Sequence, residues 1–368
     1  MPSTPRKRPA SEAFIAGGVV VLLIAVVAAV FLSGWGRSLY PPDAATVQAQ
    51  QVSGLYDVVF AVAVGIFVIV EALIVWSILR YRRRPTDTEL PPQTHGNNLV
   101  EVIWTLIPTA IVLFLFVISW QTLRTVDDTS ATPDVRVHAI AGQFQWQFEY
   151  LDANGAVIAK QIVPLAANGG GLAIPVDRNV YVTLDSPDVI HAFYVPRFLF
   201  KRDAIPGQTN HFEFRLKPDE AGQVYHGQCA ELCGVGHHIM EFSVLAMSQS
   251  DFDAWLAALV AKNNATPAPV PSGAASFTIH AKDIAYDTKT LEVAANTPFT
   301  ITFHNDDPAG VAHDVDLRQS DGKTVITDQV TTDGGQVSIY QYPGLAPGTY
   351  TFICSIHPGI MSGTLTVK

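Results

Sequence analysis

Two stretches in the first third of the chain are almost purely apolar. Residues 57 to 80 form one run, interrupted by Glu71, and residues 99 to 120 form another that ends in Trp120. An apolar run of about 20 residues can cross about 30 Å of hydrocarbon as a helix. We therefore predict a transmembrane helical hairpin over residues 50 to 122.

A third apolar run lies at the start of the chain. Residues 13 to 32 carry no charge and follow the basic residues Arg6, Lys7 and Arg8. The apolar part of a signal peptide is usually about 7 to 15 residues long and precedes a small-residue cleavage site, and neither feature is clear here. Residues 1 to 34 are thus a further transmembrane helix or a signal segment, and the anchor has two or three helices.

The arginines around the hairpin predict its orientation. Arg80 and the three arginines at positions 82 to 84 follow the run that ends at residue 80. Cytoplasmic loops carry an excess of Lys and Arg, so this cluster is expected in the cytoplasm. The next helix then leads outward, which places everything after Gln121 on the outer face of the membrane.

From residue 135 onward the pattern changes to short alternating runs separated by Gly, Pro and Asn. Apolar and polar residues that alternate at period two are typical of antiparallel, half-buried strands. We predict a β domain over residues 123 to 260, closed by a short amphipathic helix from Asp251 to Val260, and a β-sandwich over residues 277 to 368. Residues 261 to 276 are rich in Ala, Pro, Asn and Ser, as in a linker.

Composition and charge narrow the class of protein. Charged residues make up only 15% of the chain, against roughly 25% in ordinary soluble domains, as expected if part of it lies in lipid. Residues 121 to 368 hold 15 basic and 26 acidic residues. Because a phosphate-binding face must be basic, nucleic acid is excluded as the natural partner of the polar part. Three cysteines are too few for a disulfide framework.

Both β regions carry the same order of potential metal ligands. Each has a histidine, then a cysteine 38 or 41 residues later, then a histidine and a methionine close behind. These residues are His191, Cys229, His237 and Met240 in the first region and His313, Cys354, His357 and Met361 in the second. The repetition predicts two related metal sites.

In the second region the ligands fit a blue copper site. One thiolate, two imidazoles and a thioether, three of them in a C-x2-H-x3-M run, are the donors of such sites, and zinc would rarely take the thioether. A buried Cys and Met with surface histidines is the simpler explanation for any one of these residues. All four at these intervals favour copper.

The first region contains a second cysteine. In the run HGQCAELCGVGHHIM, residues 226 to 240, Cys229 and Cys233 stand four apart. Two thiolates and two imidazoles can bind one zinc ion. The spacing by itself leaves zinc, a disulfide and copper open. His238 does not fit the spacing and is expected near the site or on the surface.

Longer motifs resemble two known families. The runs TFHNDDPAGVAHDV and YTFICSIHPGIMSGTLTV resemble the plastocyanin and amicyanin branch of the cupredoxins. The run containing both cysteines, the run DVIHAFYVPRFLFKRDAIPGQTN and the membrane run VEVIWTLIP together resemble subunit II of haem-copper cytochrome c oxidases, over residues 50 to 255. These resemblances imply a membrane α-helical anchor followed by two all-β Greek-key cupredoxin sandwiches.

The resemblances also imply the ligands of each copper site. A dinuclear copper centre, CuA, is expected on the side chains of five residues and one backbone carbonyl, and a type 1 copper on four side chains. The CuA ligands are His191, Cys229, Cys233, His237, Met240 and the carbonyl of Glu231; the type 1 ligands are His313, Cys354, His357 and Met361.

Other positions carry roles implied only by the oxidase resemblance. The Glu231 carboxylate is expected to bind Mg²⁺ at the boundary with subunit I, with a solvated loop residue as the alternative. Glu101 is expected at the entrance of a proton pathway of subunit I, or is an ordinary interfacial carboxylate. Glu71 lies within an apolar span, where it faces either subunit I or solvent. The family's QWxW strand is QFQW here, so Phe144 stands where a Trp usually receives electrons from cytochrome c, and Trp146 is retained.

The chain is thus expected to be subunit II of a proton-pumping oxidase in the plasma membrane of a prokaryote, with its copper domains on the outer face. Electrons from cytochrome c or another small redox donor would pass through the fused cupredoxin and CuA to haem in subunit I. Subunit I would reduce O₂, and the other oxidase subunits would be further partners. A membrane-anchored copper shuttle is the alternative, although a shuttle has no use for VEVIWTLIP. A nitrous oxide reductase would carry a large propeller, and a quinol oxidase subunit would lack the copper ligands.

Overall fold

The computed structural model describes residues 40–81, 95–163, 171–264 and 274–368, except Lys323 and Asp328, together with scattered positions between 18 and 29. These residues divide into a helical unit, which ends at Thr125, and a second unit that holds both β regions. The expected N-terminal segment (residues 1 to 34), apart from those scattered positions, the arginines at 82 to 84 and most of the expected linker lie outside the described residues.

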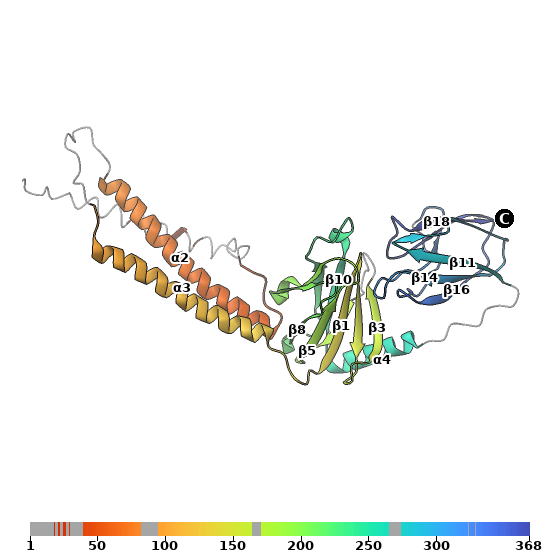
Figure 1. Cartoon of the computed structure of the whole chain (residues 1–368), viewed down its shortest axis with the longest axis horizontal. Coiled ribbons are helices and arrows are strands. Elements are labelled where there is room, and N and C mark those ends of the chain that lie inside the picture. Colours follow the sequence, from red (N-terminus) through yellow and green to blue (C-terminus); the bar gives the residue numbers. More distant parts are fainter. Residues whose placement is uncertain are drawn as a thin grey trace, which may run out of the picture. The chain divides into compact units, whose positions relative to one another are not determined.

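Two long helices form the membrane anchor. Helix α2 (Val47–Tyr81) and helix α3 (Asn98–Asp127) contain the two predicted apolar runs and extend beyond them at both ends. Both are long and apolar enough to cross a membrane. Large apolar side chains along them are exposed, as a surface that faces lipid or another membrane helix requires. The two helices run side by side (Figure 1) and residues of both line one cavity.

The first β region is a sandwich of two five-stranded sheets. One sheet has the order β3-β2-β1-β5-β8 and the other β4-β10-β9-β6-β7. The strands are β1 (Val135–Gly142), β2 (Gln145–Leu151), β3 (Val157–Val163), β4 (Gly171–Pro175), β5 (Val180–Asp185), β6 (His191–Tyr194), β7 (Lys201–Ala204), β8 (Asn210–Phe214), β9 (Val224–Cys229) and β10 (Glu241–Met247). Short 3-10 helices interrupt the loops: η2 (Pro196–Phe198), η3 (Pro218–Glu220) and η4 (His237–Ile239).

Aromatic side chains fill the space between these two sheets. Trp146 is completely buried, and its ring centroid lies 5.9 Å from that of Phe193 and 5.0 Å from that of Phe242. Strand β2 is unusual because the polar residues that alternate with its aromatic residues, Gln145 and Gln147 among them, are buried as well. Both faces of β2 are therefore covered.

Helix α4 (Gln249–Asn263) closes the first sandwich. It begins where the Ser248 side chain accepts a hydrogen bond from the backbone N–H of Asp251, a typical N-cap. Its Phe252 and Leu259 are buried in the core of the first sandwich. The predicted helix is confirmed, but it is longer than the amphipathic pattern indicated.

The second β region is a smaller sandwich of two four-stranded sheets. Their orders are β12-β11-β14-β16 and β13-β18-β17-β15. The strands are β11 (Ala275–Lys282), β12 (Ala285–Tyr286), β13 (Thr290–Val293), β14 (Phe299–Asn305), β15 (Asp316–Arg318), β16 (Val337–Tyr342), β17 (Gly348–Ile353) and β18 (Ser362–Val367). Two elements extend into the range expected to be linker, residues 261 to 276. Helix α4 ends at Asn263 and strand β11 begins at Ala275.

Most neighbouring strands are antiparallel, as the alternation predicts, but parallel pairs occur as well. Each of the four sheets contains one parallel pair, namely β1 with β5, β4 with β10, β11 with β14, and β13 with β18. Alternation of apolar and polar residues indicates which side chains face the core, but it carries no information on the direction of the neighbouring strand. Parallel neighbours need a crossover connection, and only the complete fold supplies it.

The two sandwiches touch through β2, β3 and the turn that joins β1 to β2. The Lys160 ammonium lies 2.6 Å from the Asp333 carboxylate, and the Gln145 side-chain amide donates a 3.0 Å hydrogen bond to the Gly310 carbonyl. Ile162 packs against the apolar core of the second sandwich. This contact explains why the polar side of β2 is buried.

Candidate metal centres

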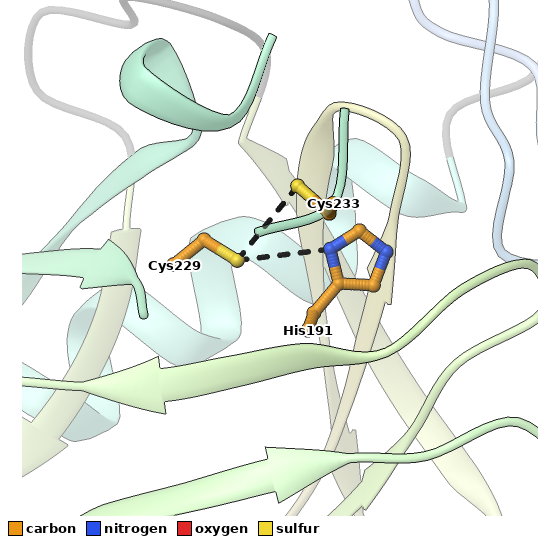
Figure 2. A group of neighbouring side chains, drawn as sticks. All are labelled: His191, Cys229 and Cys233. Atoms are coloured by element: carbon orange, nitrogen blue, oxygen red, sulfur yellow. Dashed lines mark hydrogen bonds between the residues drawn. The ribbon is translucent and has the colours of Figure 1, made fainter. Parts of the chain in front are cut away.

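The first ligand set comprises His191, Cys229, Cys233, His237 and Met240. His191 begins β6 and Cys229 ends β9, and these strands are antiparallel neighbours, so the two side chains meet. The Cys229 Sγ lies 3.7 Å from the His191 Nδ1 and 3.9 Å from the Cys233 Sγ (Figure 2). All three residues are buried.

The loop between β9 and β10 supplies the rest of the first ligand set. The Cys233 Sγ lies 3.7 Å from the His237 Nδ1 and 3.9 Å from the Met240 Sδ. The loop closes because the Cys229 N–H donates to the Met240 carbonyl at 2.9 Å. The backbone carbonyl of Glu231 is 3.3 Å from the Cys229 Sγ. Every residue expected at the first site is therefore close to one of the two sulfurs.

A carboxylate orients the first histidine. The His191 Nε2 lies 2.8 Å from the Asp188 Oδ1, so Nε2 carries the hydrogen and Nδ1 faces the thiols. Burial of the ring favours its neutral form, but the Asp188 carboxylate outweighs this and raises the pKa of His191. The other carboxylate oxygen accepts a 2.6 Å hydrogen bond from the backbone N–H of Gln143.

The paired sulfurs shift each other's pKa in opposite directions. The hydrogen bond between the two sulfurs holds the pKa of Cys229 well below its usual range, against the effect of burial. The same contact, together with burial, raises the pKa of Cys233. The cysteines of the chain are all free, so no disulfide joins this pair. Buried thiols, imidazoles and a thioether are soft and intermediate donors, which fit copper better than zinc.

The second ligand set comprises His313, Cys354, His357 and Met361. Cys354 follows the end of β17, and the loop to β18 carries His357 and Met361. The Cys354 Sγ lies 3.7 Å from the His313 Nδ1 and 3.6 Å from the His357 Nδ1. Met361 is completely buried, and its carbonyl accepts a 3.0 Å hydrogen bond from the Cys354 N–H. The side chains of His313, Cys354 and His357 thus come together, and Met361 is joined to Cys354 through its backbone carbonyl.

The second set has its own orienting carboxylate. The His313 Nε2 lies 2.8 Å from the Asp307 Oδ2, which turns Nδ1 toward the thiol. Burial and then the neighbouring His313 ring lower the pKa of His357 to about 4, so this ring is neutral. Burial also raises the pKa of the Cys354 thiol. The cluster is a dry set of one sulfur and two imidazole nitrogens beside a buried thioether, which fits a type 1 copper.

Glu231 has a partner on the surface of the first sandwich. Its carboxylate pairs with the ammonium of Lys201, which also lies 3.1 Å from Asp203. The Glu231 side chain is 40% exposed, so it is open to a further partner. The Mg²⁺ role stays a prediction, and the ion pair with Lys201 is the alternative role of this carboxylate.

The two aromatic residues expected where electrons enter are buried. Phe144 is 4% exposed and Trp146 lies in the core. Gly236 presses on the Phe144 ring so closely that a Cβ there would lie 2.4 Å from a ring carbon. Phe144 therefore sits directly beneath the loop that carries Cys233 and His237.

Glu101 lies in the first turn of α3, where it caps the helix. Its carboxylate accepts a 3.2 Å hydrogen bond from the Asn97 N–H, while the Asn97 side chain accepts from the backbone N–H groups of Leu99 and Val100. This reciprocal capping is a structural reason for a carboxylate at this position. The proton-pathway role stays a prediction, as does that of Glu71, which is half-buried on α2.

Sequence reasoning missed the residues that support the ligands. Asp188 precedes His191 by three positions and Asp307 precedes His313 by six, so no shared spacing reveals them. A third group of possible ligands, His280, His304 and Asp306, was also missed. It is only partly buried, and a 2.8 Å His280–Asp306 pair accounts for its geometry.

Two cupredoxin sandwiches with buried Cys, His and Met clusters, preceded by two apolar helices, define a membrane-anchored copper protein of the electron-transfer class. Family models match most of the chain: the transmembrane domain of cytochrome c oxidase subunit II at residues 35–122, its periplasmic domain at 135–247 and a cupredoxin-like domain at 252–367. The chain therefore belongs to the cytochrome c oxidase subunit II family and carries a fused cupredoxin domain.

Relatives support this family membership. A probable cytochrome c oxidase subunit 2 of Streptomyces avermitilis is 32% identical over 317 residues, which cover 77% of this chain and 95% of the relative. The subunit 2 of Alkalihalophilus pseudofirmus is 36% identical over 53% of this chain and 54% of its own length.

Solved structures are similar to separate parts of the chain. The periplasmic domain of subunit II from Bradyrhizobium japonicum is 27% identical and covers 36% of this chain and 99% of its own, with a TM-score of 0.33. The blue copper protein auracyanin A from Chloroflexus aurantiacus is 22% identical and covers 26% of this chain and 100% of its own, with a TM-score of 0.24.

Proposed function

We propose that this chain is the electron-accepting subunit of a proton-pumping haem-copper oxidase. The first ligand set would hold the dinuclear CuA centre, and the second would hold a type 1 copper. The observation that carries the proposal is the assembly of both buried sulfur and imidazole clusters on one membrane-anchored chain. When bound, copper at these sites supplies one-electron redox chemistry.

The protein's own residues prepare the first site for that task. Two sulfurs 3.9 Å apart, Cys229 and Cys233, can bridge a pair of metal ions, while His191 is held by Asp188. Their burial excludes water, which keeps rearrangement of the surroundings small when charge changes. A metal held by this set would accept and release an electron without a proton.

The partners follow from the oxidase role. Subunit I would supply haem, reduce O₂ and contact the exposed apolar faces of α2 and α3, with the other oxidase subunits around it. Glu231 would bind Mg²⁺ at that boundary and Glu101 would lie at a proton-pathway entrance. The copper domains would lie on the outer face of a prokaryotic plasma membrane, where cytochrome c or another small redox protein donates electrons.

We further propose that the fused cupredoxin relays electrons to CuA. The family position that receives electrons holds Phe144, which is buried beneath the ligand loop, whereas a complete second ligand set lies in the contacting domain. Cytochrome c that docks directly on the first sandwich is the competing route.

The experiment is a Cys354→Ser variant of the purified oxidase, with steady-state turnover and stopped-flow reduction of CuA as readouts. We expect loss of the blue or green absorption, slow CuA reduction and an intact CuA spectrum. Undiminished turnover would reject the relay. A complex that purifies without haem would instead support the membrane-anchored copper shuttle.

A further inference from the structure

One residue of the first sandwich touches both ligand sets. The backbone carbonyl of Gln143, in the turn between β1 and β2, lies 3.1 Å from the His357 Nε2 of the second set. Its side-chain amide donates a 2.5 Å hydrogen bond to the backbone carbonyl of Cys233 in the first set. Its backbone N–H donates to Asp188, which holds His191.

The hydrogen-bond chemistry sets the tautomer of His357. A carbonyl oxygen can only accept, so the His357 Nε2 must carry the hydrogen that it shares with Gln143. This leaves the lone pair on Nδ1, the nitrogen that faces the Cys354 Sγ at 3.6 Å. The contact to Gln143 therefore orients His357 as Asp307 orients His313.

The surrounding contacts hold the two domains together at this point. Gln145, two residues further along the chain, donates to the Gly310 carbonyl, and Gly310 has φ +95°. A Cβ on Gly310 would lie 2.5 Å from the Ile140 side chain, so only glycine permits this approach. The Lys160–Asp333 ion pair adds charge complementarity, with both side chains at most 30% exposed.

We propose that Gln143 is the electronic bridge between the two ligand sets, and that the docked face around it is the working arrangement of the relay. The proposal rests on the relay function proposed above and names the route that it takes. One electron would leave the copper held by the second ligand set and one would arrive at the copper held by the first, with no proton transfer. A small one-electron donor protein would reduce the second site again, and haem in subunit I would oxidise the first.

The route is short because it runs mainly through bonds. Electron tunnelling decays more slowly through covalent and hydrogen bonds than across empty space. The path leaves the His357 ring, crosses one hydrogen bond to Gln143, and reaches Cys233 through a second hydrogen bond or His191 through Asp188. No diffusion of either domain is needed once the face is docked.

The docked face is tested with Lys160→Glu in the copper-loaded full chain, and Lys282→Glu is the matched control. Lys282 is exposed on β11, so its variant makes the same charge change while the Lys160–Asp333 ion pair stays in place. Pulsed EPR should show one narrow distance between the copper centres in the wild type and the control, and a broad distribution in Lys160→Glu. Lys160→Arg should keep the narrow distance.

The bridge is tested by flash-induced reduction of the second site, followed by the concentration-independent transfer to the first. Gln143→Leu removes the side-chain hydrogen bond to Cys233, and Gln223→Leu, at an exposed position, is the control. We expect about tenfold slower transfer in Gln143→Leu, in the range of other changes next to metal ligands, with both optical spectra and the EPR distance unchanged. Lys160→Glu should slow transfer at least as much, since the domains must then find each other at about millimolar effective concentration.

Unchanged transfer rates in both Gln143→Leu and Lys160→Glu, the latter with a broadened distance distribution, would overturn the bridge. If Cys354→Ser still lowers turnover in that case, the relay function survives and only its route is wrong. A broad distance distribution in the wild type would overturn the docked arrangement itself.

Discussion

The two cupredoxin domains build their metal sites with the same parts. In each, a buried histidine comes from the middle of the domain and its Nε2 is held 2.8 Å from an aspartate, Asp188 or Asp307. In each, a cysteine at the end of a strand donates its N–H to the carbonyl of the site's methionine, at 2.9 Å in the first domain and 3.0 Å in the second. Both sites thus share a cysteine at the end of a strand whose backbone N–H is bonded to the methionine at the end of the ligand loop.

The difference lies in the loop between that cysteine and that methionine. In the first domain the loop is longer and carries a second sulfur, Cys233, whereas in the second domain it carries His357 only three positions after Cys354. We propose that this additional thiol allows the first site to hold two metal ions where the second holds one. The two domains hold the cysteine and the methionine in the same way, and the loop between these residues determines which further ligands each site has.

Removing the second sulfur should erase that difference. In a Cys233→Ser variant we expect the first domain to bind one copper in place of two and to lose the multi-line EPR signal of a delocalised pair, because no second thiolate bridges the ions. Copper analysis and EPR of the full chain measure this. Two retained coppers with an unchanged signal would contradict the CuA assignment, and Cys354→Ser, which should leave that signal intact, is the control.

The two aspartates should contribute equally to their own metal sites, because their contacts match. Asp188→Ala and Asp307→Ala should each weaken copper retention at their own site by about 10 to 100-fold, because each removes the group that orients a histidine. The losses should be similar, because each aspartate also accepts a backbone N–H, from Gln143 in the first domain and from Asp283 in the second. Competition against a copper chelator, read at the separate absorption bands, gives both values. Equal retention in wild type and variants would show that the carboxylates do not orient the ligands.

The Mg²⁺ role proposed for Glu231 has no proposed counterpart in the second domain. Glu231→Gln should keep the CuA spectrum and lower Mg²⁺ or Mn²⁺ retention by the assembled oxidase by about 10-fold or more. Metal analysis checks this, with Glu241→Gln as the control at an exposed carboxylate in the same domain. Unchanged occupancy would leave the Lys201 ion pair as the whole role of Glu231.

Histidine–carboxylate contacts outside the metal sites should give the smallest effects. His138 lies between Glu149 at 3.1 Å and Asp185 at 2.9 Å, and the hydrogen bond to Glu149 raises its pKa above the ordinary 6.5. Its counterpart in the second domain, His280, pairs only with exposed Asp306. We expect His138→Gln to lower stability by about 1 kcal/mol and His280→Gln by less.

The sign of the pH dependence follows from the raised pKa. The charged form of His138 is favoured in the folded state, so its contribution is complete below pH 6.5 and is lost as the pH rises through the raised value. The partner Glu149, whose pKa is lowered, must also be ionised. Calorimetry of the full chain should therefore show the largest gap between wild type and His138→Gln near pH 5.5 and a smaller one at pH 9. A gap that grows with pH would be contrary to this account.

The membrane helices, most strands and the ligand residues could be predicted from the sequence. The apolar runs inside α2 and α3, the strands of both sandwiches and the clustering of all nine ligand side chains were expected from hydropathy, alternation and motif spacing. These features depend on local pattern or on an ordered set of residue types. The parallel strand pairs and the longer α4 were not predicted, because strand partners and helix ends depend on packing between distant segments.

By itself the sequence determined which atoms are available for chemistry: three sulfhydryls, the paired histidines and the methionines that follow them, on a chain with two spans apolar enough for lipid. Only the tertiary structure decided how those atoms are held. Asp188 and Asp307 gain their roles because the fold turns them toward a histidine nitrogen, and Gln143 gains its role because two domains meet at its peptide group. The hydrogen bond between Gln143 and His357 joins residues 214 positions apart, and no sequence pattern predicts it. The packing of the two sandwiches sets the distance between these residues.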